Sequence, residues 1–231
     1  MKFTGERIII DDSTKVMKED HLNRYLFLKK FIKKNDKVID IACGTGYGTK
    51  IISELTKDII GVDISEEAIS YARSSYRSIE KNFIVGDASN YTHNHKFDIV
   101  ASFETIEHIK NYKEVIKNYN RLLINEGLLF VSSPNRSIKS PNDKLSDKPR
   151  NKFHTQEFTI SELSNFLKDS GFEILGVYGQ RKELKIKNKI LRYIYYRFLK
   201  FHERTSPKVK KLSKLSFLYP RYFIIKAKKV V

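Results

Sequence analysis

Short runs of Ile, Val, Leu and Phe recur along the chain and alternate with segments whose apolar residues return every three or four positions. Because these runs are apolar at almost every position, they suit strands that helices cover on both faces. The expected strands span residues 37–42, 58–63, 82–87, 97–103, 127–133, 172–178 and 222–228. The pattern predicts an α/β fold with a doubly wound, Rossmann-like sheet of seven strands, most of them parallel.

Segments of helical period fill several of the intervals between these strands. Residues 107–123 repeat Ile, Val and Leu at helical spacing. In "TISEL", Thr159 and Glu162 have the spacing of a capping box, and the helix that they begin is expected to end at Gly171. Residues 134–152 hold three prolines among polar residues, which favours a mobile loop over one rim of the sheet.

Composition limits the class of protein. The 231 residues suffice for one domain, 1–231, with its own core, and the single cysteine excludes an internal disulfide. The apolar run near the N-terminus is far too short for a signal peptide, and no stretch approaches the roughly 20 apolar residues of a membrane span. We therefore expect a cytoplasmic protein. The net charge of +17 favours anionic partners, although an AT-rich genome also enriches a chain in Lys, Ile and Asn.

The turn after the first expected strand carries the clearest chemistry. The stretch "DIACGTGYGTK" contains Asp40, Gly44, Gly46 and Gly48. Glycines at a strand-to-helix turn let the backbone approach a ligand closely. Asp63 follows at the end of the second strand, where an acidic side chain can accept both hydroxyls of a ribose. Asp87 ends the third strand, and open parallel sheets bind ligands at this edge.

The stretch from Asp40 to Gly48 resembles the first motif of the class I S-adenosylmethionine-dependent methyltransferases. That motif consists of an acidic residue, three further residues and then G-x-G-x-G. The resemblance implies S-adenosyl-L-methionine as cofactor and an antiparallel last strand. It implies cofactor contacts from Asp40, from Gly44, Gly46 and Gly48 of the glycine turn, and from Asp63, Ile64, Asp87, Ala88 and Phe103. Phe103 is expected to pack on the adenine, and a core phenylalanine is the alternative.

The N-terminal segment, residues 1–36, contains "HLNRYLFLKKFI", which looks like the helix that covers the cofactor in many relatives. Arg24 stands where ubiquinone-biosynthesis O-methyltransferases have an arginine that holds the methionyl carboxylate, a pairing that can be bidentate. A structural arginine on a solvated helix face is the alternative. The opening "TGER" with "HLNRYLF" resembles methyltransferases found among polysaccharide and O-antigen biosynthesis enzymes, which favours a glycan acceptor.

The stretch "SFETIEHI" gathers Glu104, Glu107 and His108 just past the fourth strand. If a helix begins here, the three side chains share one face, and His154 from the following loop could complete a four-ligand site for Mg²⁺ or Mn²⁺. The pattern resembles ubiquinone-type O-methyltransferases and enzymes that methylate the 2′-hydroxyl of small RNAs. Glu104 and His108 are therefore the candidate catalytic residues. Two alternatives stay open: His108 as a metal-free general base, and a structural role for the whole cluster.

Residues 181–219 form a basic insertion that predicts an amphipathic helix. Such a helix could pack as a lid or dimer contact, lie on an anionic membrane surface, or bind RNA. The expected function is methyl transfer from S-adenosylmethionine to an oxygen of a glycan or other small molecule. An RNA ribose 2′-O-methyltransferase and a non-catalytic basic binding protein on the same fold are the alternatives.

Overall fold

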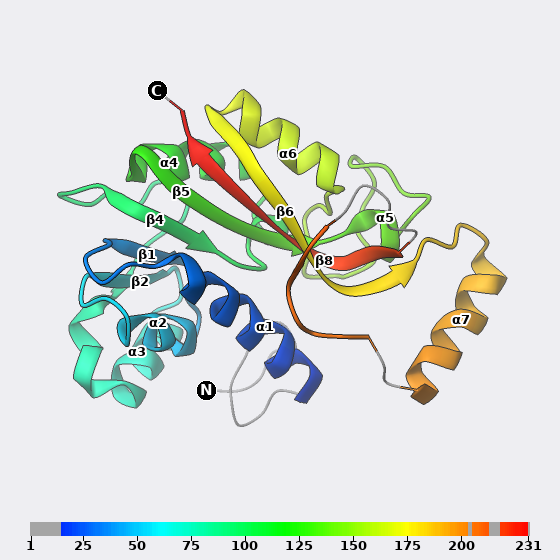
Figure 1. Ribbon diagram of the computed structural model, residues 1–231, viewed down its shortest axis with the longest axis horizontal. Helices are drawn as coiled ribbons and strands as arrows, with labels where there is room; N and C mark the ends of the chain where they lie inside the picture. Colours follow the sequence, from blue (N-terminus) through cyan, green and yellow to red (C-terminus); the bar gives the residue numbers. More distant parts are fainter. Residues whose placement is uncertain (1–14, 203–204, 213–217, 231) are drawn as a thin grey trace.

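The computed structural model describes residues 15–202, 205–212 and 218–230, so the "TGER" stretch lies outside the described residues (Figure 1). One sheet of eight strands has the order β3-β2-β1-β4-β5-β8-β6-β7. The strands are β1 (Val38–Ile41), β2 (Ile59–Asp63), β3 (Phe83–Val85), β4 (Phe97–Ser102), β5 (Leu123–Pro134), β6 (Phe172–Leu184), β7 (Lys210–Lys211) and β8 (Leu218–Lys229). The α-helices are α1 (Lys15–Leu28), α2 (Tyr47–Ser53), α3 (Glu66–Ser75), α4 (Tyr112–Leu122), α5 (Arg136–Lys139), α6 (Ile160–Asp169) and α7 (Lys189–His202).

The expected α/β fold is confirmed. Strands β1 to β5 pair in parallel, and β8 lies antiparallel between β5 and β6. All seven expected strands are present, and the additional strand is the two-residue β7 at the edge of the sheet. Strand β1 lies between β2 and β4, so the winding direction of the chain reverses there. Such a reversal opens a crevice at the carboxyl ends of the strands.

Both faces of the sheet are buried, as the continuous apolar runs predicted. Alternate strand residues enter two separate cores, so that Ile39 and Val100 face α4 and α6 whereas Val38 and Ile99 face α1 and α2 (Figure 1). A period of two is what a pleated strand imposes on its side chains. Helices therefore cover both faces of the sheet.

Two expected elements differ in the structure. The helix expected over 107–123 is divided into a 3-10 turn, Ile106–His108, and helix α4. The loop expected over 134–152 begins as structured chain, because β5 continues to Pro134 and α5 follows directly. Arg136, a polar residue in that loop, is buried and donates through Nε to the carbonyl of Glu157. A polar composition marked this segment as a loop, but at its start Arg136 is buried and a hydrogen bond satisfies its side chain.

The basic insertion is partly strand. Strands β6 and β8 remain paired as far as Leu184 and Leu218, well beyond the predicted ends of these strands. Helix α7 follows β6 and projects from the body of the molecule at the end of this two-stranded arm (Figure 1). In this part of β6 and β8, glycines and charged residues interrupt the apolar pattern from which the strands were predicted. The hydrogen bonds between the two backbones do not need that pattern and continue the pairing. The predicted amphipathic helix is present, although the side chains of Phe198, Leu199, Lys200 and Phe201, like Arg204, lie outside the described residues.

The capping box at the start of α6 gives a stability prediction. The Thr159 hydroxyl accepts from the Glu162 N–H at 3.2 Å, and the Glu162 carboxylate accepts from the Thr159 N–H at 2.8 Å. We expect Thr159→Ala to lower the free energy of unfolding by about 1 kcal/mol. Urea denaturation of this variant beside Ser161→Ala, an exposed serine of the same helix, measures the effect. Equal stability of the two variants would contradict the prediction.

Candidate functional site

A cavity of about 590 Å³ lies at the carboxyl ends of the first four strands. The loops after β1, β2, β3 and β4 line it, together with the inner side of α1 and the 3-10 turn. The lining residues are His21, Tyr25, Ala42, Cys43, Gly44, Thr45, Tyr47, Asp63, Ile64, Gly86, Asp87, Ala88, Phe103, Glu104, Thr105, His108, Ile109 and Lys110. The cavity therefore occupies the crevice that the reversal of strand order creates.

Asp63 holds the glycine turn against the second strand. Its Oδ2 accepts from the Gly44 N–H and its Oδ1 from the Ser65 N–H, both at 2.9 Å. Each carboxylate oxygen has two lone pairs, so Asp63 can still accept two hydroxyl groups of a ligand. Gly46 begins α2 with a φ of 79°, a conformation that a residue with a side chain rarely adopts.

Gly48 makes room for a protein side chain rather than for a ligand. A Cβ at this position would lie 1.9 Å from Cζ of Tyr25, so the aromatic ring of α1 packs directly on the glycine. The Tyr25 hydroxyl donates to Asp40 at 3.0 Å, and the Thr49 hydroxyl donates to the same carboxylate at 2.8 Å. Asp40 is buried behind the cavity wall, and burial raises its pKa to about 7. Asp40 therefore fastens α1 to the turn.

Where the loops after β2 and β3 line the cavity, an apolar surface lies beside hydrogen-bond acceptors. The Ile64 side chain is 69% exposed although it is a large hydrophobic residue, and it faces the cavity beside Ala88. Asp87 accepts from the backbone N–H and the hydroxyl of Ser89, both at 2.8 Å. Phe103 contributes to the wall, but its ring is buried and meets Tyr25 edge-on at 5.1 Å. Phe103 therefore belongs to the core as well as to the cavity.

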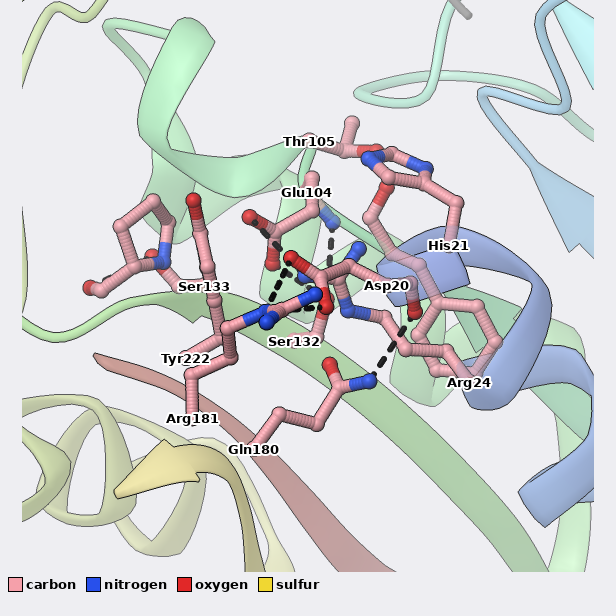
Figure 2. A network of polar contacts seen from close by, with 12 residues as sticks. Asp20, His21, Arg24, Glu104, Thr105, Ser132, Ser133, Gln180, Arg181 and Tyr222 are labelled. Carbon is pink, nitrogen blue, oxygen red and sulfur yellow. Dashed lines mark hydrogen bonds and ion pairs between the residues drawn. The ribbon is translucent and has the colours of Figure 1, made fainter. Parts of the chain in front are cut away.

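Glu104, which lines the cavity, pairs with the buried Arg24 (Figure 2). Glu104 has a left-handed backbone with a φ of 51°, and its Oε1 accepts from the Ser132 hydroxyl at 2.7 Å. Nη2 of Arg24 lies 3.5 Å from Oε2 of Glu104. The Arg24 side chain is 1% exposed and its guanidinium stacks 5.0 Å from the centre of the Tyr222 ring. Arg24 thus lies behind the wall that Glu104 forms, and its expected contact with the methionyl carboxylate stays a prediction.

A second pair joins the same helix to the end of β6 (Figure 2). Nε of Arg181 donates to the Asp20 carboxylate at 2.8 Å, and Nε2 of Gln180 donates to the Asp20 carbonyl at 3.0 Å. Burial raises the pKa of Asp20, and the positive charge of Arg181 opposes that rise. These contacts join α1, which contributes two residues to the cavity, to the base of the β6–β8 arm.

The predicted metal cluster is only partly assembled. Ligand atoms of Glu107, His108 and His154 lie within 4.8 Å of one another. Glu104 is not part of this group, because its carboxylate is turned toward Ser132 and Arg24. The four-ligand arrangement is therefore corrected to three residues. The physical reason is the break in the expected helix: Glu104 precedes the 3-10 turn with a left-handed backbone and shares no helical face with the others.

The two histidines have different surroundings. Nδ1 of His108 lies 3.0 Å from the Phe153 carbonyl, which can only accept, so Nδ1 carries the proton and Nε2 is the basic nitrogen. In His154, Nδ1 lies 2.9 Å from a Glu157 carboxylate oxygen and Nε2 lies 2.9 Å from the Asn151 amide nitrogen. Protein groups thus contact both ring nitrogens of His154. Only His108 of this pair lines the cavity.

Several lining residues were not predicted from the sequence. His21, Tyr25 and Tyr47 form one wall, where Nδ1 of His21 lies 3.0 Å from the Tyr47 hydroxyl. Burial lowers the pKa of His21 well below its ordinary value, and the charge of Arg24 lowers it further. The stretch "HLNRY" could have indicated them, because His21 and Tyr25 are four residues apart and share a helix face with Arg24, which was already a candidate cofactor contact.

A model described as a methyltransferase domain matches residues 32–196. The chain belongs to this methyltransferase family. A probable S-adenosylmethionine-dependent methyltransferase of Mycobacterium tuberculosis is 33% identical over 186 residues, which cover 78% of this chain and 64% of that protein. One of Mycolicibacterium smegmatis is 32% identical over 150 residues, covering 61% of this chain and 54% of that protein. The chain thus spans about half to two thirds of the length of these relatives.

Solved structures agree with the fold. An S-adenosylmethionine-dependent methyltransferase of Thermotoga maritima superposes with a TM-score of 0.63 at 19% identity, covering 93% of this chain and 91% of that one. The [4+2]-cyclase SpnF has a TM-score of 0.62 at 14% identity, covering 98% of this chain and 86% of that one. A protein named as a cyclase therefore shares the fold, so the reaction must be inferred from the residues of the site.

Asp40 gives a pH prediction. Because its pKa is about 7 in the folded protein and near 3.8 when unfolded, the folded state keeps a proton that the unfolded state releases between these values. Stability should therefore fall as the pH rises from about 4 to about 7, by about 3 kcal/mol from this group. Asp40→Asn should remove that fall.

Urea denaturation of both proteins across this pH range measures the effect. At about pH 4 the two proteins should differ little, and Asp40→Asn should be the more stable near pH 8. A difference that does not change with pH would contradict the prediction.

Proposed function

We propose that this methyltransferase transfers the methyl group of S-adenosylmethionine to an oxygen of a glycan or other small-molecule acceptor. One observation carries the proposal: Asp63 and the exposed Ile64 face the same cavity beside the glycine turn. Asp63 suits a ribose, because a carboxylate can accept both of its hydroxyls. Ile64 suits the adenine ring, because a large apolar side chain in an otherwise polar loop gains by covering a planar base.

His108 is proposed as the general base. S-adenosylmethionine supplies an electrophilic methyl group on a sulfonium sulfur. With Nδ1 protonated toward Phe153, Nε2 of His108 can take the proton of an acceptor hydroxyl as the oxygen forms its bond to the methyl carbon and the carbon–sulfur bond breaks. Glu104, held by Ser132 and Arg24, can accept a hydrogen bond from the acceptor and so align its oxygen. The proton then leaves His108 for solvent.

A second candidate is a metal-assisted reaction at Glu107, His108 and His154. One carboxylate and two imidazoles suit Mn²⁺ or another divalent cation, and such an ion lowers the pKa of a bound hydroxyl. The Glu157 carboxylate beside Nδ1 of His154 would orient that ring, as carboxylates commonly do for metal-binding histidines. Asn151 would have to release Nε2 of His154 for this nitrogen to bind the ion.

Calorimetry with S-adenosylhomocysteine tests the cofactor. We expect binding by the unmutated protein and an affinity about tenfold lower in Ile64→Ser, because the variant loses apolar surface that the adenine would cover. Ile64 is 69% exposed without ligand, so the fold should be unaffected. Ile124→Ser, an exposed residue of β5 away from the cavity, is the control and should bind normally. Absence of binding by the unmutated protein would refute the proposed function.

Manganese titration separates the two mechanisms. If Glu107, His108 and His154 bind a metal, electron paramagnetic resonance should detect bound Mn²⁺. His154→Ala should lower the affinity for Mn²⁺ by about tenfold or more, while S-adenosylhomocysteine binds as before. A matched variant, His95→Ala, removes a histidine from outside the cluster and should leave manganese binding unchanged. If neither the unmutated protein nor the control binds Mn²⁺, the metal-assisted mechanism is wrong and His108 acts alone.

A further inference from the structure

The outer side of helix α7 exposes apolar side chains in a strongly basic setting. Ile190, Leu191 and Ile194 are 71%, 58% and 56% exposed, values unusual for such residues in a folded protein. They lie at positions i, i+1 and i+4, so they form one stripe along the helix. Lys189 and Arg197, also exposed, lie beside this stripe.

Contacts with the arm determine which side of the helix faces outward. Arg192 is buried, so its side of the helix faces the protein. The Tyr195 hydroxyl accepts from the Leu184 N–H at 3.2 Å, which fastens the helix to the end of β6. Asn188 caps the first turn, because its Oδ1 accepts from the N–H groups of Ile190 and Leu191. The apolar stripe is therefore held away from the body of the molecule.

Positive charge is concentrated in the segment of the chain that carries this stripe. Residues 181–219 contain thirteen Lys and Arg residues but only two Glu, so they carry more than half of the net charge of +17. No helix of the described residues is long and apolar enough to cross a bilayer. An exposed apolar stripe flanked by Lys and Arg is instead typical of a helix that lies in the membrane interface.

We propose that α7 docks on the surface of an anionic lipid membrane, with Ile190, Leu191 and Ile194 inserted among the acyl chains. A lipid surface matches both properties of the helix, because its headgroups attract Lys and Arg and its hydrocarbon accepts the apolar stripe. RNA would neutralise the charge but leave the stripe in water. A second copy of the chain would cover the stripe but bring the same positive charge against it. This inference goes beyond the proposed methyl transfer and does not depend on it.

Flotation with lipid vesicles tests the inference. The full chain should bind vesicles of phosphatidylcholine with phosphatidylglycerol, and binding should weaken in vesicles of phosphatidylcholine alone and at high salt. Changing Ile190, Leu191 and Ile194 together to Ser should lower the partition coefficient at least about tenfold. Changing Lys189 and Arg197 to Gln should lower it about fivefold for each charge lost.

A matched triple variant controls for the loss of exposed apolar surface in general. Ile124, Leu175 and Val230 are 38%, 39% and 40% exposed, and they lie toward the opposite end of the long strands. Changing these three to Ser should leave vesicle binding unchanged. S-adenosylhomocysteine binding should be the same in all variants, so a failure of this inference is distinguishable from a failure of the proposed function.

Three results would overturn the inference. One is equal binding of the two triple variants to anionic vesicles. Another is that the full chain does not bind vesicles but binds single-stranded RNA, and that the triple variant of Ile190, Leu191 and Ile194 binds this RNA equally well. The third is that light scattering shows the full chain to be a dimer that does not bind vesicles, and that the triple variant of Ile190, Leu191 and Ile194 is a monomer.

Discussion

Helix α1 is held against the sheet by polar contacts that are shielded from water. Asp20 joins it to Gln180 and Arg181, Arg24 pairs with Glu104, and Tyr25 donates to Asp40. Such contacts are costly to break singly, because the partner left behind is a buried polar or charged group. The position of α1 is therefore specified by complementary polar groups as well as by the apolar contacts of Phe27 and Leu28 beneath it.

The cavity depends on this arrangement. Its floor is the edge of the parallel sheet, where the chain leaves β1 and β4 through left-handed residues, Ala42 at a φ of 60° and Glu104 at 51°. Non-glycine residues in this conformation are strained, and such strain often occurs at functional sites. Its roof is α1. Because α1 also contacts Gln180 and Arg181 of β6, one set of hydrogen bonds joins the wall of the cavity to the arm that carries α7.

Much of the fold was predictable because the signals are local. Apolar runs predicted the strands, and the glycine turn with Asp63 predicted the position of the cavity. The geometry of Glu104 was not predictable, because helical spacing after β4 assumes a helix that the left-handed residue and the 3-10 turn interrupt. The roles of Arg24 and Gly48 also depend on distant contacts. Arg24 pairs with Glu104, and Gly48 admits the ring of Tyr25, and neither partner can be read from the local sequence.

A crystal structure of the protein with S-adenosylhomocysteine tests the central claim, that the cavity under α1 is the cofactor site. The ribose hydroxyls should lie within hydrogen-bonding distance, about 2.5 to 3.0 Å, of the Asp63 carboxylate, with the adenine against Ile64 and α1 still bound to the sheet through Arg24 and Asp20. A ligand bound outside this cavity, or one whose ribose lies away from Asp63, would contradict it.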